Sequence, residues 1–277
     1  MALIEAPPVD MILFFQKVRK AQQEWAEEIS LALTEEQKEK VQTLLSKKEH
    51  AWSHELFPFE PTRLRQYGEG ILDLLQAMLQ REDGSDENNL GTLSSLHKLL
   101  KGEEASEFYR LLALGDFEEL EQKGLALDID LPLLHYFIRA MLKPYLLASS
   151  KALEETIATR DWREPFCPHC GSEPTLGRLS KEEHGKRYLY CSTCETEWPF
   201  RRVVCPFCAN EDQYSLPIYY VDEERHYRIE GCNQCKRYLK TVDERYYQKQ
   251  ERLDLYEEDV ATVQLDLVAR EKGLRQK

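Results

Sequence analysis

The residues of this sequence with the clearest potential for chemistry are its eight cysteines. They form four Cys-X-X-Cys pairs with none left over. The pairs are Cys167 with Cys170, Cys191 with Cys194, Cys205 with Cys208, and Cys232 with Cys235. The first two pairs are separated by 20 residues and the last two by 23, whereas only 10 residues lie between the second pair and the third. The gap lengths therefore predict two groups of four cysteines, 167/170/191/194 and 205/208/232/235.

A group of four cysteines in two such turns is typical of a metal site. Both sulfurs of a Cys-X-X-Cys turn can point at one centre while backbone N–H groups help to neutralise the thiolates. Two turns then complete a tetrahedral site of four sulfurs that has no open coordination position. Thiolates in a tetrahedron select zinc or iron, and the cysteine pattern fits both. We expect two metal ions, Fe or Zn, with all eight cysteines as ligands.

Two other uses of paired cysteines are less favoured. Structural disulfides belong to oxidising compartments, whereas the early apolar run 11–15 has neither the basic start nor the cleavage site of a secretory signal. A cytoplasmic location is the expectation. A redox dithiol of the thioredoxin type would open a helix in a βαβ unit, and the sequence around these cysteines is strand-like instead.

The remaining residues offer no catalytic grouping. His169 lies between the first two cysteines, but four sulfurs already fill the tetrahedron, so we expect a solvated histidine there. The sequence contains neither GxxxxGK[ST] nor GxGxxG, and no Ser-His-Asp or Cys-His-Asn set can be argued from spacing. We therefore expect no catalytic residues, no cofactor-binding residues besides the metal ligands, and no enzyme activity.

Charge argues against nucleic acid as a partner. The net charge is −13, with 19 Lys and Arg against 30 Asp and Glu in residues 1–164, and 18 against 20 in residues 165–277. Neutralising phosphates calls for a strongly basic surface, which neither half provides. No apolar run approaches the roughly 18 residues of a membrane span, so we expect no membrane insertion.

The elements that must position the cysteines change in character near Pro165. Before that point a helical period predicts an all-α bundle. The first helix is expected over about 10–33, and a second begins at a capping box that starts with Thr34. Further helices are expected over 62–82, 93–101, 104–123 and 131–159. The segment 131–147 is the most hydrophobic and should lie at the centre of the bundle. Pro144 predicts a kink or a break near residue 143.

After Pro165 the pattern is that of short strands between the cysteine pairs. Runs rich in Tyr, Val and Ile cover 187–191, 197–204, 214–221, 226–230 and 238–242. The tail from about 254 to 270 returns to helical spacing and ends near Gly273.

Four segments resemble the FdhE family of formate dehydrogenase accessory proteins. They are Cys167–Pro174, Arg187–Trp198, Cys205–Cys208 and Gly231–Lys240. Asp259–Gly273 is similar to the closing helix of that family. The first 160 residues match the family only in being helical, in the hydrophobic run 133–147 and in length.

The resemblance implies a fold, a metal and a partner. The fold would be α+β, with an N-terminal all-α helical bundle (1–164), a first rubredoxin-like or zinc-ribbon β module (165–200), a second such module (201–250) and a C-terminal helix (251–277). The resemblance further implies metal on the eight cysteines, iron among the candidates, a cytoplasmic location, and self-association as in a homodimer. It implies contact with the catalytic, molybdenum- or tungsten-containing subunit of formate dehydrogenase.

The favoured function is a non-catalytic accessory or assembly factor needed before formate dehydrogenase becomes active. One alternative is a redox-active, rubredoxin-like electron-transfer protein acting during maturation, and another is a zinc-ribbon nucleic-acid-binding protein. The contact with the catalytic subunit would be made by the strand edges or by the exposed aromatic residues near Trp198, Phe200, Phe207 and Tyr214. The competing interpretation is that these aromatic residues fill small cores beneath the cysteine turns.

Overall fold

A computed structural model describes residues 9–79, 87–157, 161–220, 225–247 and 253–276 of the chain. The chain divides into two compact units. The helical unit comprises residues 13–32 and 52–151, and the cysteine unit comprises the residues up to 12 together with 33–51 and 152–277.

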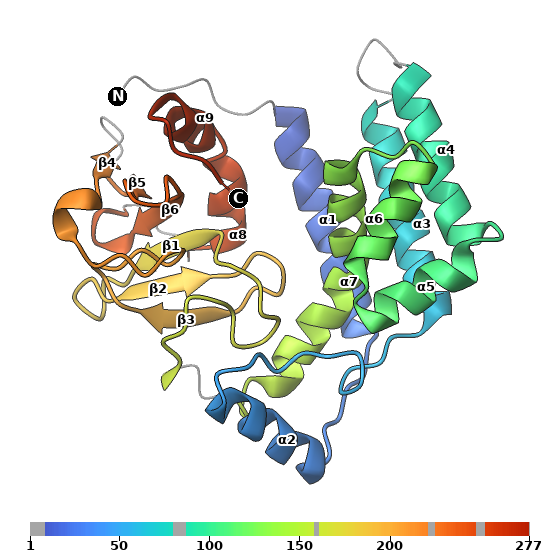
Figure 1. The fold of residues 1–277 in the computed structure, drawn as a ribbon, viewed down its shortest axis with the longest axis horizontal. Coiled ribbons are helices and arrows are strands. Elements are labelled where there is room, and N and C mark those ends of the chain that lie inside the picture. The colour runs from blue at the N-terminus through green and yellow to red at the C-terminus, as the bar shows by residue number, and fades with distance from the viewer. Residues whose placement is uncertain (1–8, 80–86, 158–160, 221–224, 248–252, 277) are drawn as a thin grey trace. The chain divides into compact units, whose positions relative to one another are not determined.

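The described part of the helical unit is built from six helices (Figure 1). They are α1 (Val9–Glu27), α3 (Pro61–Leu79), α4 (Glu87–Lys101), α5 (Ala105–Leu114), α6 (Phe117–Ala126) and α7 (Leu131–Leu153). Helix α7 supplies much of the core, because Leu134, Phe137 and Met141 are all fully buried. The Gln22 side chain donates a hydrogen bond of 2.9 Å to the Ala140 carbonyl and so ties α1 to α7. The predicted all-α bundle and its central helix are confirmed.

Three details of the helices differ from the sequence-based expectation. The predicted helix 104–123 is two helices, because Gly115 adopts a left-handed φ of 69° and Asp116 caps the start of α6 through the Glu119 N–H. Helix α1 ends at Glu27 instead of residue 33. Helix α7 continues through Pro144 to Leu153, so the break allowed for near residue 143 does not occur.

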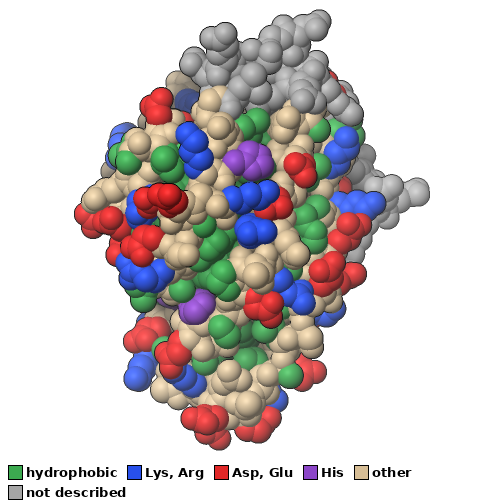
Figure 2. Space-filling view, turned by 90° about the vertical axis from the view of Figure 1, so that its right-hand side faces the viewer, with side chains coloured by type: hydrophobic (Ala, Val, Ile, Leu, Met, Phe, Trp, Pro, Cys, Tyr) green, Lys and Arg blue, Asp and Glu red, His purple; other side chains and the backbone are tan. Residues whose placement is uncertain are grey.

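The surface of the molecule on the side of α3 to α6 carries a mixture of charges. Figure 2 shows Lys and Arg side chains interspersed with Asp and Glu side chains, with small hydrophobic areas between them. Leu114, Phe117 and Leu125 are more than half exposed on α5 and α6. Within the described residues, no helix has the length and apolar character needed to cross a membrane.

In its described residues, the cysteine unit contains one mixed sheet of six short strands. The strands are β1 (Leu176–Leu179), β2 (Arg187–Tyr190), β3 (Glu197–Phe200), β4 (Ile218–Tyr220), β5 (Tyr227–Gly231) and β6 (Tyr238–Asp243), in the order β3-β2-β1-β6-β5-β4. All neighbours are antiparallel except β1 and β6, which run parallel. The α+β fold with two zinc-ribbon-like modules is confirmed: β1 to β3 form the first and β4 to β6 the second, joined at the parallel pair.

Strand β1 is the element that the sequence pattern missed. Its four residues, Leu-Gly-Arg-Leu, include no β-branched or aromatic side chain. Gly177 sits at the strand junction, where an added Cβ would lie 2.6 Å from Thr241 Oγ1 of β6. A glycine here allows the two backbones to approach closely and pair. This pairing turns two small modules into one sheet.

Three further helices belong to the cysteine unit. Helix α2 (Glu35–Ser46) begins with the predicted capping box, in which Thr34 and Gln37 exchange hydrogen bonds of 2.9 and 3.2 Å. The tail holds α8 (Leu255–Ala261) and α9 (Gln264–Glu271), where the sequence pattern predicted a single helix. Both tail helices contribute to a core with Tyr227, Ile229 and Val242 of the sheet.

A buried arginine joins the two modules on the other face of the sheet. Arg187 of β2 is 2% exposed and forms an ion pair of 2.8 Å with Glu230 of β5. The same guanidinium donates hydrogen bonds to the carbonyls of Arg201 at 3.2 Å and of Val204 at 2.9 Å. Burial alone raises the pKa of Glu230, but Arg187 and Arg228 outweigh it and the pKa is lowered overall. Glu230 is therefore ionised at neutral pH.

Replacing Arg187 should destabilise the cysteine unit strongly. In Arg187→Met the Glu230 carboxylate stays buried with one partner fewer, and breaking a buried ion pair costs about 3 kcal/mol. The urea midpoint, followed by near-ultraviolet circular dichroism, should fall accordingly. Arg201→Met is the control, because Arg201 is 56% exposed and its ion pair, with Glu211, lies at the surface. Equal midpoints for the two variants would contradict this account.

Candidate metal centres

All four Cys-X-X-Cys turns have the same backbone conformation. In each turn the N–H four residues after the first cysteine donates to the carbonyl of that cysteine, at 2.8 to 3.0 Å. The donating residues are Gly171, Glu195, Ala209 and Lys236, and all four have a left-handed φ, of 74°, 60°, 57° and 60°. Three of the four are not glycine, so the fold accepts a left-handed strain of about 1 kcal/mol or more at each of them. One rigid turn is thus used four times.

These turns bring the cysteines together in two groups of four. The groups are 167/170/191/194 and 205/208/232/235, and within each group the sulfurs lie within 4.8 Å of one another. The Sγ–Sγ distances include 3.4 Å (Cys167–Cys194), 3.5 Å (Cys170–Cys191), 3.7 Å (Cys205–Cys235) and 3.6 Å (Cys208–Cys232). All eight are free cysteines. The grouping is the one that the gap lengths predict.

The sulfur positions fit a tetrahedral ion. Zn–S bonds of about 2.3 Å in a tetrahedron place the sulfurs about 3.8 Å apart. These four Sγ–Sγ distances are within 0.4 Å of that value, and the donor set is entirely sulfur. Ligation of a metal by these eight residues remains our prediction, and iron and zinc both suit the donors.

The first group is the more enclosed of the two. Cys167, Cys191 and Cys194 are at most 1% exposed. Hydrogen bonds from the neighbouring cysteines hold the pKa of Cys191 well below its usual range, whereas burial raises the pKa of Cys167 and Cys194. A metal ion that takes all four sulfurs would displace the remaining thiol protons, so binding should release protons.

The expectation that His169 is solvated is wrong. The side chain is fully buried, and burial lowers its pKa to about 4, so the ring is neutral. The cause is the segment that follows α2: the Ala51 N–H donates to the Pro168 carbonyl at 2.9 Å. At Gly171 an added Cβ would meet the His50 ring at 2.7 Å. Residues 50–51 therefore cover the first cysteine turn, although they lie more than 100 positions before it in the sequence.

The second group is more open and has a polar neighbour. Cys208 and Cys235 are partly exposed. The Asn210 amide donates to Cys232 Sγ at 3.6 Å. Burial raises the pKa of Cys232, but hydrogen bonds from the backbone N–H of Cys235 and from Asn210 lower it to about 7. Donors of this kind orient and stabilise a thiolate ligand.

Arg237 links the two cysteine groups. It forms two hydrogen bonds of 2.8 Å to the Glu173 carboxylate, next to the first group, and its guanidinium lies 3.8 Å from the centre of the Phe207 ring, next to the second. Paired forks of this kind fix both partners. Asn210, Arg187 and Arg237 were not singled out from the sequence, because their roles depend on partners 14 to 64 residues away.

The four candidate aromatic residues divide between the two interpretations. Trp198 is fully buried and donates to the Glu164 carbonyl at 3.0 Å, and Phe200 is 7% exposed. Phe207 lies beneath Arg237. Tyr214, by contrast, is 89% exposed. Two of the four therefore fill the core, and only Tyr214 is fully available at the surface.

Two family models match the part of the chain that contains the cysteine turns. Residues 166–202 match the family model "FdhE, central domain", and residues 191–277 match "FdhE, C-terminal domain". Together the two matches cover all eight cysteines.

Similar proteins include two named "Protein FdhE homolog". One, from Aquifex aeolicus, is 32% identical over 144 residues, which are 51% of this chain and 49% of the relative. The other, from Pasteurella multocida, is 30% identical over 206 residues, which are 73% of this chain and 62% of the relative. The chain thus aligns with about half to three fifths of these curated relatives. The crystal structure of the FdhE protein from Pseudomonas aeruginosa has the same fold, with a TM-score of 0.60, 21% identity, and coverage of 96% of this chain and 90% of that one.

Metal content should follow the two groups separately. Protein purified without oxygen should hold two equivalents of transition metal per chain, measured by elemental analysis. Cys170→Ser should lose one equivalent and Cys208→Ser the other, because three sulfurs hold the ion much more weakly than four. If either single variant kept two equivalents, the assignment of the ligands would be wrong.

Proposed function

The chain belongs to the FdhE family, and from this premise we propose that it is a non-catalytic accessory protein needed for the maturation or activity of formate dehydrogenase. Its partner would be the catalytic, molybdenum- or tungsten-containing subunit. The proposal extends to this chain the role that its sequence resemblance implies.

The observation that carries the proposal is the pair of four-cysteine groups within one sheet. An ion held by four sulfurs has no position left for a substrate, so its contribution is to hold the protein in shape. Around each group the strands are only three to six residues long, so an ion bound by both turns of a module would add a link that holds these short strands together. This construction supports a protein that presents a surface to a partner.

Metal at the second group would also shape nearby surface. Cys205 follows the segment 201–204, whose carbonyls accept hydrogen bonds from Arg187. The ion would fix the end of that segment, and Arg187 would fix its middle. We infer that loss of the second ion loosens this surface before it affects the helical unit.

The proposed function is tested by rescue in a strain that lacks this protein. Formate dehydrogenase activity should be lost and should return with the wild-type chain. It should not return with Cys205→Ser/Cys208→Ser, because the metal-dependent surface is lost. Protein levels are checked by immunoblot, and Arg201→Ala serves as a variant that leaves the cysteines intact. Unchanged activity in the deletion strain would overturn the proposed function.

Electron transfer is a second candidate, favoured by the partial exposure of Cys208 and Cys235. An iron ion bound there would lie near the surface, where a redox partner could approach. The anaerobically purified protein should then show the visible absorption of iron bound by four thiolates, and the absorption should bleach on reduction. A colourless zinc protein that still restores formate dehydrogenase activity would exclude this role.

A further inference from the structure

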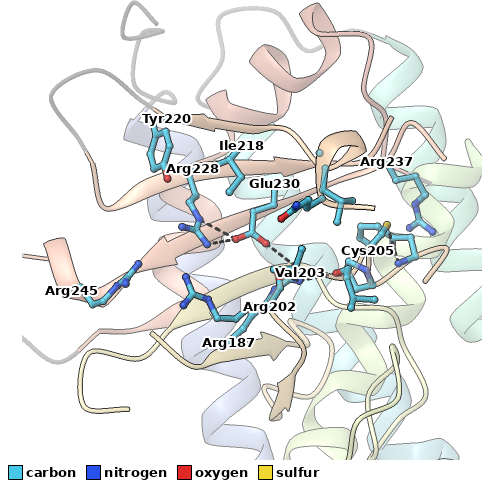
Figure 3. A pocket seen from close by; sticks show the side chains of 16 residues that line it. Arg187, Arg202, Val203, Cys205, Ile218, Tyr220, Arg228, Glu230, Arg237 and Arg245 are labelled. Carbon is cyan, nitrogen blue, oxygen red and sulfur yellow. Dashed lines mark hydrogen bonds and ion pairs between the residues drawn. The ribbon is translucent and has the colours of Figure 1, made fainter. Parts of the chain in front are cut away.

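A pocket of about 430 Å³ lies on the face of the sheet opposite the tail helices (Figure 3). Tyr219 of β4 packs against the core that includes α8 and α9. Successive side chains of a strand alternate between faces, so Ile218 and Tyr220 point to the other face and line the pocket. We call this the arginine pocket, after the five arginines in its wall: Arg187, Arg202, Arg228, Arg237 and Arg245.

The arginine pocket is positively charged in an otherwise acidic chain. Arg187 and Arg228 both pair with Glu230. Arg245 pairs with Asp243 at 2.7 Å, and Arg228 lies 3.7 Å from the same carboxylate.

Arg237, the fifth arginine, pairs with Glu173 at 2.8 Å. Five guanidinium groups therefore stand against three carboxylates, Glu230, Asp243 and Glu173, which leaves two positive charges in excess. Arg202 is exposed, and its side chain has no ion pair within the described part of the chain. The chain as a whole carries a net charge of −13. Guanidinium forks match carboxylates in geometry as well as in charge. The pocket thus favours an anionic group.

Strand β4, beside the pocket, has an open backbone edge. The Gly231 N–H donates to the Pro217 carbonyl at 2.9 Å, and the register pairs Ile218 with Glu230 and Tyr220 with Arg228. In an antiparallel ladder, hydrogen-bonded pairs alternate with pairs whose N–H and C=O groups point away. The backbone groups of Ile218 and Tyr220 therefore face outward, and no strand of the described chain lies on that side.

The first module shows what this edge can bind. Strands β1 and β4 are each the first strand after the first cysteine turn of their modules, and so occupy equivalent places. On its equivalent edge β1 pairs in parallel with β6 over four residues, from Leu176 opposite Lys240 to Leu179 opposite Asp243. The edge of β4 is open because no further module follows in the sheet. The same geometry there can accept an added parallel strand.

Apolar side chains at the mouth of the pocket favour a polypeptide over a small anion. Val203, Ile218 and Tyr220 are 53%, 46% and 51% exposed, and all three line the pocket. A small anion would leave these side chains in water, whereas an extended peptide would cover them with every second side chain. The combination of a free strand edge, apolar rim and excess positive charge fits an acidic extended segment.

We propose that the edge of β4 binds an extended acidic segment of the partner protein as an added parallel strand. An Asp or Glu side chain of the segment enters the arginine pocket near Arg202. A neighbouring apolar side chain on the same face packs on Ile218 and Tyr220. The identification of that partner as the formate dehydrogenase catalytic subunit rests on the proposed function.

Charge reversal at Arg202 tests the pocket in the full-length chain. Binding of the purified catalytic subunit is measured by surface plasmon resonance, with the wild-type chain immobilised. Arg202→Glu should weaken binding about tenfold or more, because it removes the excess positive charge and repels the acidic side chain. The matched control is Arg201→Glu, which changes the net charge equally at a residue that points outside the pocket, and it should bind within about twofold of wild type.

A second pair of variants tests the apolar rim. Tyr220→Ser should weaken binding about fivefold or more, and Tyr246→Ser should leave it nearly unchanged, because Tyr246 is similarly exposed, at 48% against 51%, but does not line the pocket. The bound segment itself is found with an array of overlapping 15-residue peptides from the catalytic subunit. Bound peptides should contain an Asp or Glu two residues from an apolar residue, and replacing that acid by Ala should abolish binding.

The outcomes separate this inference from the proposed function. If the wild-type chain does not bind the catalytic subunit, the proposed function is wrong. If the wild-type chain binds and both Arg202→Glu and Tyr220→Ser bind like their controls, the function stands and the peptide site is wrong. A third outcome is that inorganic phosphate raises the melting temperature of wild type but not of Arg202→Glu, while Arg202→Glu binds the catalytic subunit as tightly as wild type does. The pocket is then a small-anion site, and the inference is overturned.

Discussion

The structure of the cysteine unit depends on bringing four sulfurs to one point, twice. Each group requires two turns with a residue in the left-handed conformation, and the strands only connect these turns. Each strand of three to six residues buries little surface, whereas ordering its backbone costs about 1–2 kcal/mol per residue. A bound ion would supply the missing free energy directly, because metal affinity and folding free energy are linked when the ligands assemble only in the folded chain.

The cysteine groups hold each module together, but other contacts join the two modules into one sheet. Gly177 permits the close pairing of β1 with β6, and Arg187 and Arg237 reach across the junction to Glu230 and Glu173. Buried ion pairs contribute little net stability compared with well-packed apolar groups, but an incorrect partner would leave a charge unpaired. We infer that these arginines select the correct arrangement of two similar modules more than they strengthen it.

The sequence predicts local features of this protein well and its long-range contacts poorly. The grouping of the cysteines follows from gap lengths, and the capping box at Thr34 follows from residues three apart. Strand β1 has no local signal, because Gly177 is explained only by the neighbouring β6. The burial of His169 likewise depends on residues 50–51, more than 100 positions earlier. Gly115 and Asp116 are local signals for the end of α5 and the start of α6. The helical hydrophobic period continues on both sides of them, so the pattern predicted one helix instead of two.

The two modules are similar, but their first strands differ in one respect: one has a paired outer edge and the other an open one. The edge that β6 fills beside β1 remains open beside β4. Exposed strand edges invite indiscriminate pairing, and proteins limit this with short strands and nearby charge. Strand β4 has three residues and lies beside a cluster of arginines, so uncharged or basic strands gain little by pairing there. An acidic strand would gain both the backbone hydrogen bonds and the charge, so the features that protect the edge would also give it specificity.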